Sequence, residues 1–160
     1  MKKAQTIKVE FHLVKNDMND FDREEVSRIL NIVPTYSSHP RISKGKMCCN
    51  DLEKVNREFQ GLTIIQSSES PYNIVIHACW EFEILVQTNS LQLALEKLKS
   101  CLCGKEELLE RVCSEYNLTK EVIFRIYSKK AMMPELFLSK EDVKYLNHIG
   151  VSFGLDLQLE

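Results

Sequence analysis

Apolar and polar residues alternate near the start of the chain, a pattern typical of a β-strand that buries one face. The apolar parity of this alternation consists of Ile7, Val9, Phe11 and Leu13. A short helix is predicted next, because Asp22 and Glu25 have a spacing that resembles an N-terminal capping box. Pro34 ends this helix, and the turn-forming residues within 35–45 predict a loop.

A longer alternation runs over 74–86 and predicts a single long strand. Its buried parity consists of Ile74, Ile76, Ala78, Trp80, Phe82, Ile84 and Val86. Trp80 shares this parity, so we expect it to pack in the core rather than to form an exposed binding platform. The residues before this strand show no clear period, and we interpret 35–77 as a variable loop region within a single domain, 1–160.

Helical periodicity begins at Asn89 or Ser90, either of which can act as an N-cap. Leucines at three- and four-residue spacing predict one amphipathic helix face, and they are Leu91, Leu95, Leu98 and Leu102. Gly104 interrupts this helix, and a second helix is expected to end at Asn117.

Two further strands are predicted near the end of the chain, over 122–127 and 152–159. Ser139 caps a short helix between them, and Gly150 stands where a left-handed C-terminal cap is needed. The order of elements predicts an α+β domain with a mainly antiparallel or mixed sheet and helices packed on one face. The leading topology is ferredoxin-like, a split βαβ unit extended by a C-terminal helix and strand.

Composition and charge exclude several classes of partner. The chain has 160 residues and a net charge of -2, so it offers no basic footprint, and we predict no nucleic-acid partner. The most apolar stretch is broken by His77, Glu81 and Glu83, which predicts no membrane span. Polar residues near the N-terminus break any apolar export signal. We therefore expect a cytoplasmic protein whose six cysteines are reduced.

Several short segments share the pattern of one known family. They are ILNIVPT at 29–35, KG at 44–45, WEF at 80–82, LEKL at 95–98, FLS at 137–139 and VSFGLDL at 151–157. In these segments the chain resembles the bacterial domain-of-unknown-function family 4279. The resemblance covers most of the chain, with 47–77 longer and less similar than the usual pattern. It implies a compact bacterial α+β protein and carries over no catalytic residue.

The polar parity of the predicted strands carries the candidate binding residues. They are His12, Glu81, Glu83, Arg125, Tyr127 and Asp156. Two carboxylates beside a histidine are a combination that acid-base chemistry uses. The favoured interpretation is nevertheless a solvated sheet face with cross-strand ion pairs, and a ligand or protein surface is the alternative. We predict no catalytic residue and no cofactor.

The spacing of cysteine and histidine residues gives no metal motif. Zinc needs about four converging ligands, usually supplied as two close pairs, and none of the six cysteines forms a C-x₂-C pair. A site built from Cys48, Cys49, His77 and Cys79 remains an alternative, because His77 and Cys79 share one strand face. We expect no bound metal.

The leading functional hypothesis is a non-enzymatic protein-protein interaction module. Its partner would be another protein, which it neutralises as an immunity protein does, or a second copy in a homodimer. The alternative is a small-molecule-binding domain or an unrecognised hydrolase that uses Glu81, Glu83, His12 or Asp156. A deep pocket that unites these residues would favour this alternative, whereas their dispersal over a flat sheet would count against it.

Overall fold

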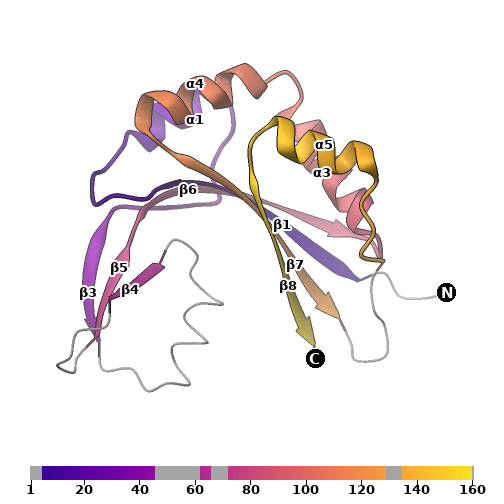
Figure 1. The fold of residues 1–160 in the computed structure, drawn as a ribbon, viewed down its shortest axis with the longest axis horizontal. Coiled ribbons are helices and arrows are strands. Elements are labelled where there is room, and N and C mark those ends of the chain that lie inside the picture. The colour runs from indigo at the N-terminus through magenta and orange to yellow at the C-terminus, as the bar shows by residue number, and fades with distance from the viewer. Residues whose placement is uncertain (1–4, 46–61, 66–71, 129–134, 160) are drawn as a thin grey trace.

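The structure is a computed structural model that describes residues 5–45, 62–65, 72–128 and 135–159. In these residues the chain forms two β-sheets and four helices, an α+β arrangement (Figure 1). The main sheet has five strands in the order β2-β6-β1-β7-β8. Their bounds are β1 (Thr6–Lys15), β2 (Tyr36–Ser38), β6 (Ala78–Gln87), β7 (Thr119–Ser128) and β8 (Ser152–Leu159).

The central strand of this sheet is β1, which pairs antiparallel with both β6 and β7. Consequently β6 and β7 run parallel to each other on either side of β1. They are connected through α3 (Leu91–Leu102) and α4 (Glu106–Tyr116). The last strand, β8, follows α5 (Lys140–His148) and pairs parallel with β7. The sheet is therefore mixed, and the α+β class predicted from the sequence is confirmed.

The core lies between the main sheet and the helices, which cover one of its faces (Figure 1). Register places Phe11 between Phe82 of β6 and Val122 of β7, and all three side chains are buried. Trp80 is buried as well, and its indole Nε1 donates a hydrogen bond of 2.8 Å to Ser27 Oγ on α1 (Arg23–Leu30). The prediction that Trp80 packs in the core is confirmed.

A second sheet of three strands, in the order β3-β5-β4, lies on the side of the main sheet away from the helices (Figure 1). Its strands are β3 (Arg41–Gly45), β4 (Leu62–Ile65) and β5 (Tyr72–Ile76). Two predictions are corrected here. The stretch 35–45 is not a loop, because β2 and β3 lie within it. The single strand predicted over 74–86 is divided at His77 into β5 and β6, which have different partners.

Most of the predicted helix ends agree with the structure, except that α1 ends at Leu30, where Asn31 adopts a left-handed conformation, and not at Pro34. Asp22 and Ser90 accept hydrogen bonds at the N-termini of α1 and α3. Asn117, Gly104 and Gly150 have positive φ angles of 54°, 74° and 65°. These left-handed conformations stop the helices where the sequence predicted. No helix in the described residues combines the length and apolar character needed to cross a bilayer.

Replacing Ser139 by alanine should destabilise the fold modestly. Ser139 Oγ accepts a hydrogen bond of 3.1 Å from the backbone N–H of Asp142, and Asp142 Oδ2 accepts one of 2.8 Å in return from the N–H of Ser139. Losing such a cap costs about 1 kcal/mol. Urea unfolding should show this decrease for Ser139→Ala but not for Lys140→Ala, which removes only an exposed side chain. Equal stability of both variants would contradict the assignment of the cap.

Candidate functional site

The sheet face turned away from the helices gathers charged side chains from four strands. Because side chains alternate along a strand, His12 on β1, Glu81 on β6 and Arg125 on β7 all point to this side. His12 lies directly opposite Glu81, and Glu10 lies opposite Glu83. We call this face the polar face. It holds a connected set of ion pairs.

The strongest part of the polar face is centred on Arg125. Its Nε donates to Glu10 Oε1 at 2.7 Å, and its Nη1 donates to Asp156 Oδ2 at 2.9 Å. On the other side of Glu10, Lys8 Nζ lies 2.7 Å from Glu10 Oε1 and 3.2 Å from Glu83 Oε2. The carboxylates of β1, β6 and β8 are therefore neutralised by cations of β1 and β7.

Glu10 is ionised at the centre of this network although it is 2% exposed. Burial acts to raise the pKa of its carboxyl, but interactions with His12, Arg125 and Lys8 outweigh burial. The net result lowers the pKa of Glu10 from 4.5 to about 2. A carboxylate held in this way keeps its negative charge at any physiological pH.

The polar face is not solvated at its centre, which corrects the favoured interpretation of the sequence. Glu10 and His12 are 2% and 3% exposed. The physical reason is the position of β1 in the middle of the sheet, where side chains of β6 and β7 flank it on both sides. The long side chains of Lys8 and Arg125 contact Glu10 from its own strand and from β7.

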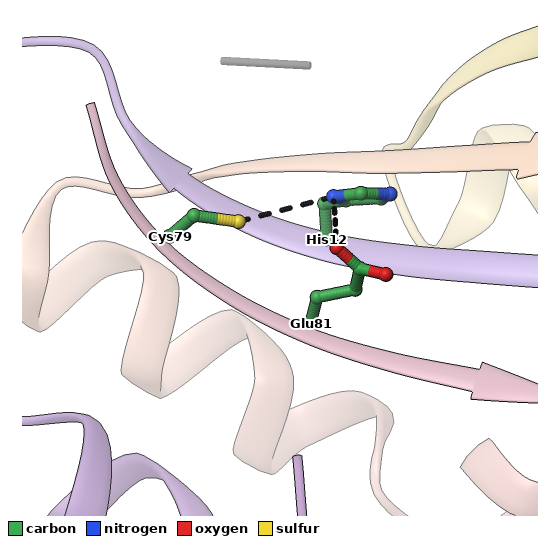
Figure 2. A group of neighbouring side chains, drawn as sticks. All are labelled: His12, Cys79 and Glu81. Carbon is green, nitrogen blue, oxygen red and sulfur yellow. Dashed lines mark hydrogen bonds and ion pairs between the residues drawn. The ribbon is translucent and has the colours of Figure 1, made fainter. Parts of the chain in front are cut away.

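His12 lies beside the thiol of Cys79 and the carboxylate of Glu81 (Figure 2), and the carboxylate of Glu10 lies near its other nitrogen. Its Nδ1 is 3.8 Å from Cys79 Sγ and 3.5 Å from Glu81 Oε2, whereas its Nε2 is 3.5 Å from Glu10 Oε2. Burial raises the pKa of the Glu81 carboxyl. The imidazole thus has a long, weak hydrogen bond with the thiol, whereas the oxygens of Glu81 and Glu10 lie beyond the usual hydrogen-bond distance.

The thiol of Cys79 is not an activated nucleophile in this environment. Burial, followed by the negative charges of Glu81 and Glu121, raises its pKa to about 12. A catalytic cysteine needs the opposite surroundings, which lower the pKa and supply thiolate near neutral pH. The His12 and Cys79 pair therefore lacks the electrostatics of a cysteine hydrolase.

Five of the six candidate binding residues are brought together in this network. They are His12, Glu81, Glu83, Arg125 and Asp156. Tyr127 lies on the same strand as Arg125, but the described residues offer its side chain no hydrogen bond or ion pair. The network also contains Lys8, Glu10 and Cys79. The sequence placed Glu10 on the same polar surface as His12, and Cys79 was considered only as a metal ligand, whereas Lys8 was not considered. Strand parity puts all three on this face, but only the register of β1 and β6 brings them beside His12 or Glu83.

Among the described residues, two groups of side chains have metal-ligand atoms within 4.8 Å of one another, the first being His12, Cys79 and Glu81. The second is Glu10, Glu81 and Glu83, but Lys8 already neutralises two of its carboxylates. The alternative site with Cys48, Cys49 and His77 lies partly outside the described residues, because Cys48 and Cys49 are not described.

The structure shows a shallow depression of about 390 Å³ over β7 and β8. Its lining residues are Glu121, Ile123, Ser152, Phe153, Gly154, Leu155 and Asp156. Of the candidate binding residues only Asp156 belongs to this set. The depression therefore does not unite the residues that the enzymatic alternative requires.

The edge strand β8 carries partly exposed apolar side chains on the face opposite the polar face. Phe153, Leu155 and Leu157 are 41%, 47% and 38% exposed, although they share the parity of the core residues of β7. Phe153 contacts Phe124 with a ring-centroid distance of 5.5 Å, so this apolar row continues the core outward to the edge.

Comparison with known proteins adds no relative. No family model matches the chain, and no curated protein or solved structure matches it. The resemblance to the domain-of-unknown-function family 4279 therefore stays a prediction, as does the cytoplasmic location expected from the sequence.

Proposed function

We propose that the protein is a non-enzymatic protein-protein interaction module that binds through its edge strand β8, and that the strand added there belongs to a second copy of the chain. The observation that carries this proposal is the half-exposed apolar row of Phe153, Leu155 and Leu157 beside an outer edge that no described strand pairs with. Such edges accept an additional strand, whose backbone hydrogen bonds provide affinity while its side chains provide specificity.

The sequence of β8 lacks the devices that keep edge strands apart. Edges that stay free are commonly protected by lysine, proline or a bulge. The eight residues of β8, SFGLDLQL, contain no lysine and no proline. Their one charged side chain, Asp156, is already paired with Arg125. This strand is therefore free to pair with another strand without placing a repelling charge in the contact.

A second copy fits this edge in a self-complementary register. If two β8 strands pair antiparallel about Leu155, Phe153 lies opposite Leu157 and Gly154 lies opposite Asp156 of the other copy. The largest apolar side chain then meets a smaller one, and no like charges face each other. A two-fold contact of this kind is isologous, since the same strand serves both copies. It would extend the main sheet into a continuous sheet across the dimer.

The polar face gives less support to the enzymatic alternative. The carboxylates of Glu10, Glu83 and Asp156 are neutralised by Arg125 and Lys8, and burial raises the pKa of the Cys79 thiol to about 12, so it is protonated near neutral pH. A catalytic site instead keeps a base or nucleophile that is available to substrate. We infer that most of this network stabilises the sheet that presents β8.

The ferredoxin-like topology is part of the same proposal. It is supported by β6 and β7, which run parallel with β1 between them and are connected through α3 and α4. This is the arrangement of a split βαβ unit. The addition of α5 and β8 then carries the sheet outward and creates the edge that the proposed contact uses.

Charge substitutions at the dimer axis test the contact directly. In the proposed register Leu155 meets Leu155 of the second copy, so Leu155→Lys and Leu155→Glu each place like charges opposite each other. Like-charge contacts across an interface cost several kcal/mol, so each variant should raise the dimer Kd by about 100-fold or more. An equimolar mixture of the two variants should restore the dimer, because lysine then faces glutamate. Sedimentation velocity measures the monomer–dimer equilibrium of each variant and of their mixture.

Val143→Lys is the matched control, because Val143 is an exposed apolar residue of α5 that lies outside β8. It should leave the dimer Kd unchanged. The proposal is overturned if the unmodified protein sediments as a monomer at every concentration, or if mixing the two Leu155 variants restores nothing. A monomer that instead binds a strand of another protein would point to the neutralising form of the interaction.

A further inference from the structure

Three side chains of different chemistry converge between β1 and β6, and the proposed function uses none of them. They are His12 from β1 and Cys79 and Glu81 from β6 (Figure 2). Cys79 and Glu81 are two residues apart on one strand, so they share a face, and Glu81 lies directly opposite His12. We propose that these residues form a binding site for a single zinc-type transition-metal dication.

The distances between the three ligand atoms suit tetrahedral coordination. Ordinary zinc bonds to nitrogen, sulfur and oxygen would separate the nitrogen from the sulfur by about 3.6 Å and from the oxygen by about 3.3 Å. The observed separations from His12 Nδ1 are 3.8 Å to Cys79 Sγ and 3.5 Å to Glu81 Oε2. Both separations exceed the values for zinc by only a few tenths of an ångström, and all three ligand atoms lie within 4.8 Å of one another.

The same distances are poor for hydrogen bonds. A buried imidazole normally has a nitrogen or oxygen partner within about 3.2 Å. His12 is 3% exposed, yet within the described residues neither of its nitrogens has such a partner, and Nε2 makes no hydrogen bond there. The Nδ1 atom has only the thiol of Cys79 and the carboxylate of Glu81 as polar neighbours, at 3.8 Å and 3.5 Å. A bound cation would give these atoms a stronger partner than they offer one another.

Glu10 completes the arrangement as a positioning residue. Its Oε2 lies 3.5 Å from His12 Nε2, the nitrogen that faces away from the proposed ion. Histidine ligands commonly direct their second nitrogen to a carboxylate, which fixes the ring and the tautomer. With the proton on Nε2, the lone pair of Nδ1 is available toward Cys79 and Glu81.

The electrostatic surroundings favour a dication. The carboxylates of Glu81 and Glu10 lie 3.5 Å from the two nitrogens of His12, so negative charge is placed on both sides of the imidazole. A bound dication would offset these negative charges. It would coordinate Cys79 as a thiolate, and the proton lost by the thiol would pass to solvent. Nitrogen, sulfur and oxygen together are the ligand set of zinc rather than of magnesium or calcium, which prefer oxygen alone.

Titration of the metal-free protein with Zn²⁺ and with Co²⁺ tests this site. Calorimetry with Zn²⁺ should give one site per chain, and Co²⁺ should show the near-ultraviolet charge-transfer band of a cobalt-thiolate bond. Glu10→Gln should weaken Zn²⁺ binding by about 10–100-fold, as the loss of a carboxylate behind a ligating histidine does. Cys79→Ser and Glu81→Gln should weaken it further, and Cys79→Ser should abolish the cobalt band.

Cys113→Ser is the matched control, since Cys113 is a buried thiol on α4, outside the main sheet. It should retain both the stoichiometry and the cobalt band. The proposal is overturned if Cys79→Ser binds Zn²⁺ like the unmodified protein, or if binding depends on Cys48 and Cys49 instead. If circular dichroism shows that Cys79→Ser does not fold, the Zn²⁺ affinity of Glu81→Gln is the deciding measurement, because this substitution preserves side-chain shape. An unchanged affinity would then overturn the proposal. The oligomeric state of these variants is a separate readout, so failure here leaves the β8 contact unaffected.

Discussion

Trp80→Ala should lower the free energy of unfolding by about 3–5 kcal/mol, the range for removing a large aromatic side chain from a packed core. The indole is fully buried between β6 and α1 and contacts Phe82 with a ring-centroid distance of 5.8 Å. Its removal leaves a cavity where sheet and helix meet, which the surrounding main chain cannot readily fill. Urea denaturation monitored by circular dichroism measures the change.

Two further variants separate the contributions of packing and hydrogen bonding at Trp80. Ser27→Ala removes the acceptor of the indole N–H, and leaving such a buried donor unpaired costs about 1–3 kcal/mol. Leu93→Ala removes an exposed side chain of α3 and should change stability by less than about 0.5 kcal/mol. A Trp80→Ala variant no less stable than Leu93→Ala would show that this position is not part of the core.

Arg125→Met should lower the free energy of unfolding by about 3 kcal/mol, the lower end of the range for breaking a buried ion pair, because Asp156 loses its cation while Glu10 keeps Lys8. Arg125 joins Glu10 to Asp156 across three strands, and its side chain is 8% exposed. The methionine keeps much of the aliphatic volume, so the loss reports mainly on charge. Chemical denaturation at neutral pH provides the measurement.

A double-variant cycle tests whether the loss arises from the pair itself. Glu10→Gln removes the charge that Arg125 pairs with, so the combined variant should be more stable than the sum of the two single losses predicts. Arg28→Met is the control, because Arg28 pairs with Glu25 on an exposed helix surface and its loss should leave the free energy of unfolding nearly unchanged. Strict additivity of Glu10→Gln and Arg125→Met would show that the two side chains do not interact energetically.

The same pair should make stability depend on acidity. The folded pKa of Glu10, about 2, lies below its ordinary value of 4.5. Its ionised form therefore stabilises the fold above about pH 4.5, and this contribution is lost as the pH falls toward 2. The free energy of unfolding, measured by denaturation at each pH, should decrease less steeply between pH 4.5 and 2 for Arg125→Met than for the unmodified protein. The variant has already lost part of the stabilisation that ionised Glu10 provides.

Strand parity and helix caps were the features that the sequence predicted well. The positions of Trp80, Ser139 and Gly150 follow from local rules, because parity, capping and left-handed backbone each depend on a few neighbouring residues. The gathering of His12, Glu81 and Arg125 on one face also follows from parity once the strands are paired.

Features that depend on which strands are neighbours were not predictable. Alternation continues through His77, yet the chain changes sheets there, because the parity of a strand does not identify its partners. The polar face was expected to be solvated, but its centre at Glu10 and His12 is buried because β1 is the central strand. Cys79 joins His12 only through the pairing of β6 with β1, so no spacing along the sequence indicated their contact.

The central position of β1 also has a consequence for how the chain folds. Both neighbours of β1 come from much later in the sequence, and the Glu10 and Arg125 contact spans 115 residues. Loops of this length must close before the sheet gains its main contacts, which slows folding in proteins of high contact order. During synthesis β1 leaves the ribosome long before β6 and β7 exist. The apolar side chains of β1 therefore stay exposed to solvent until β6 and β7 are synthesised. We expect newly made chains to depend on chaperones more than a helical protein of equal length.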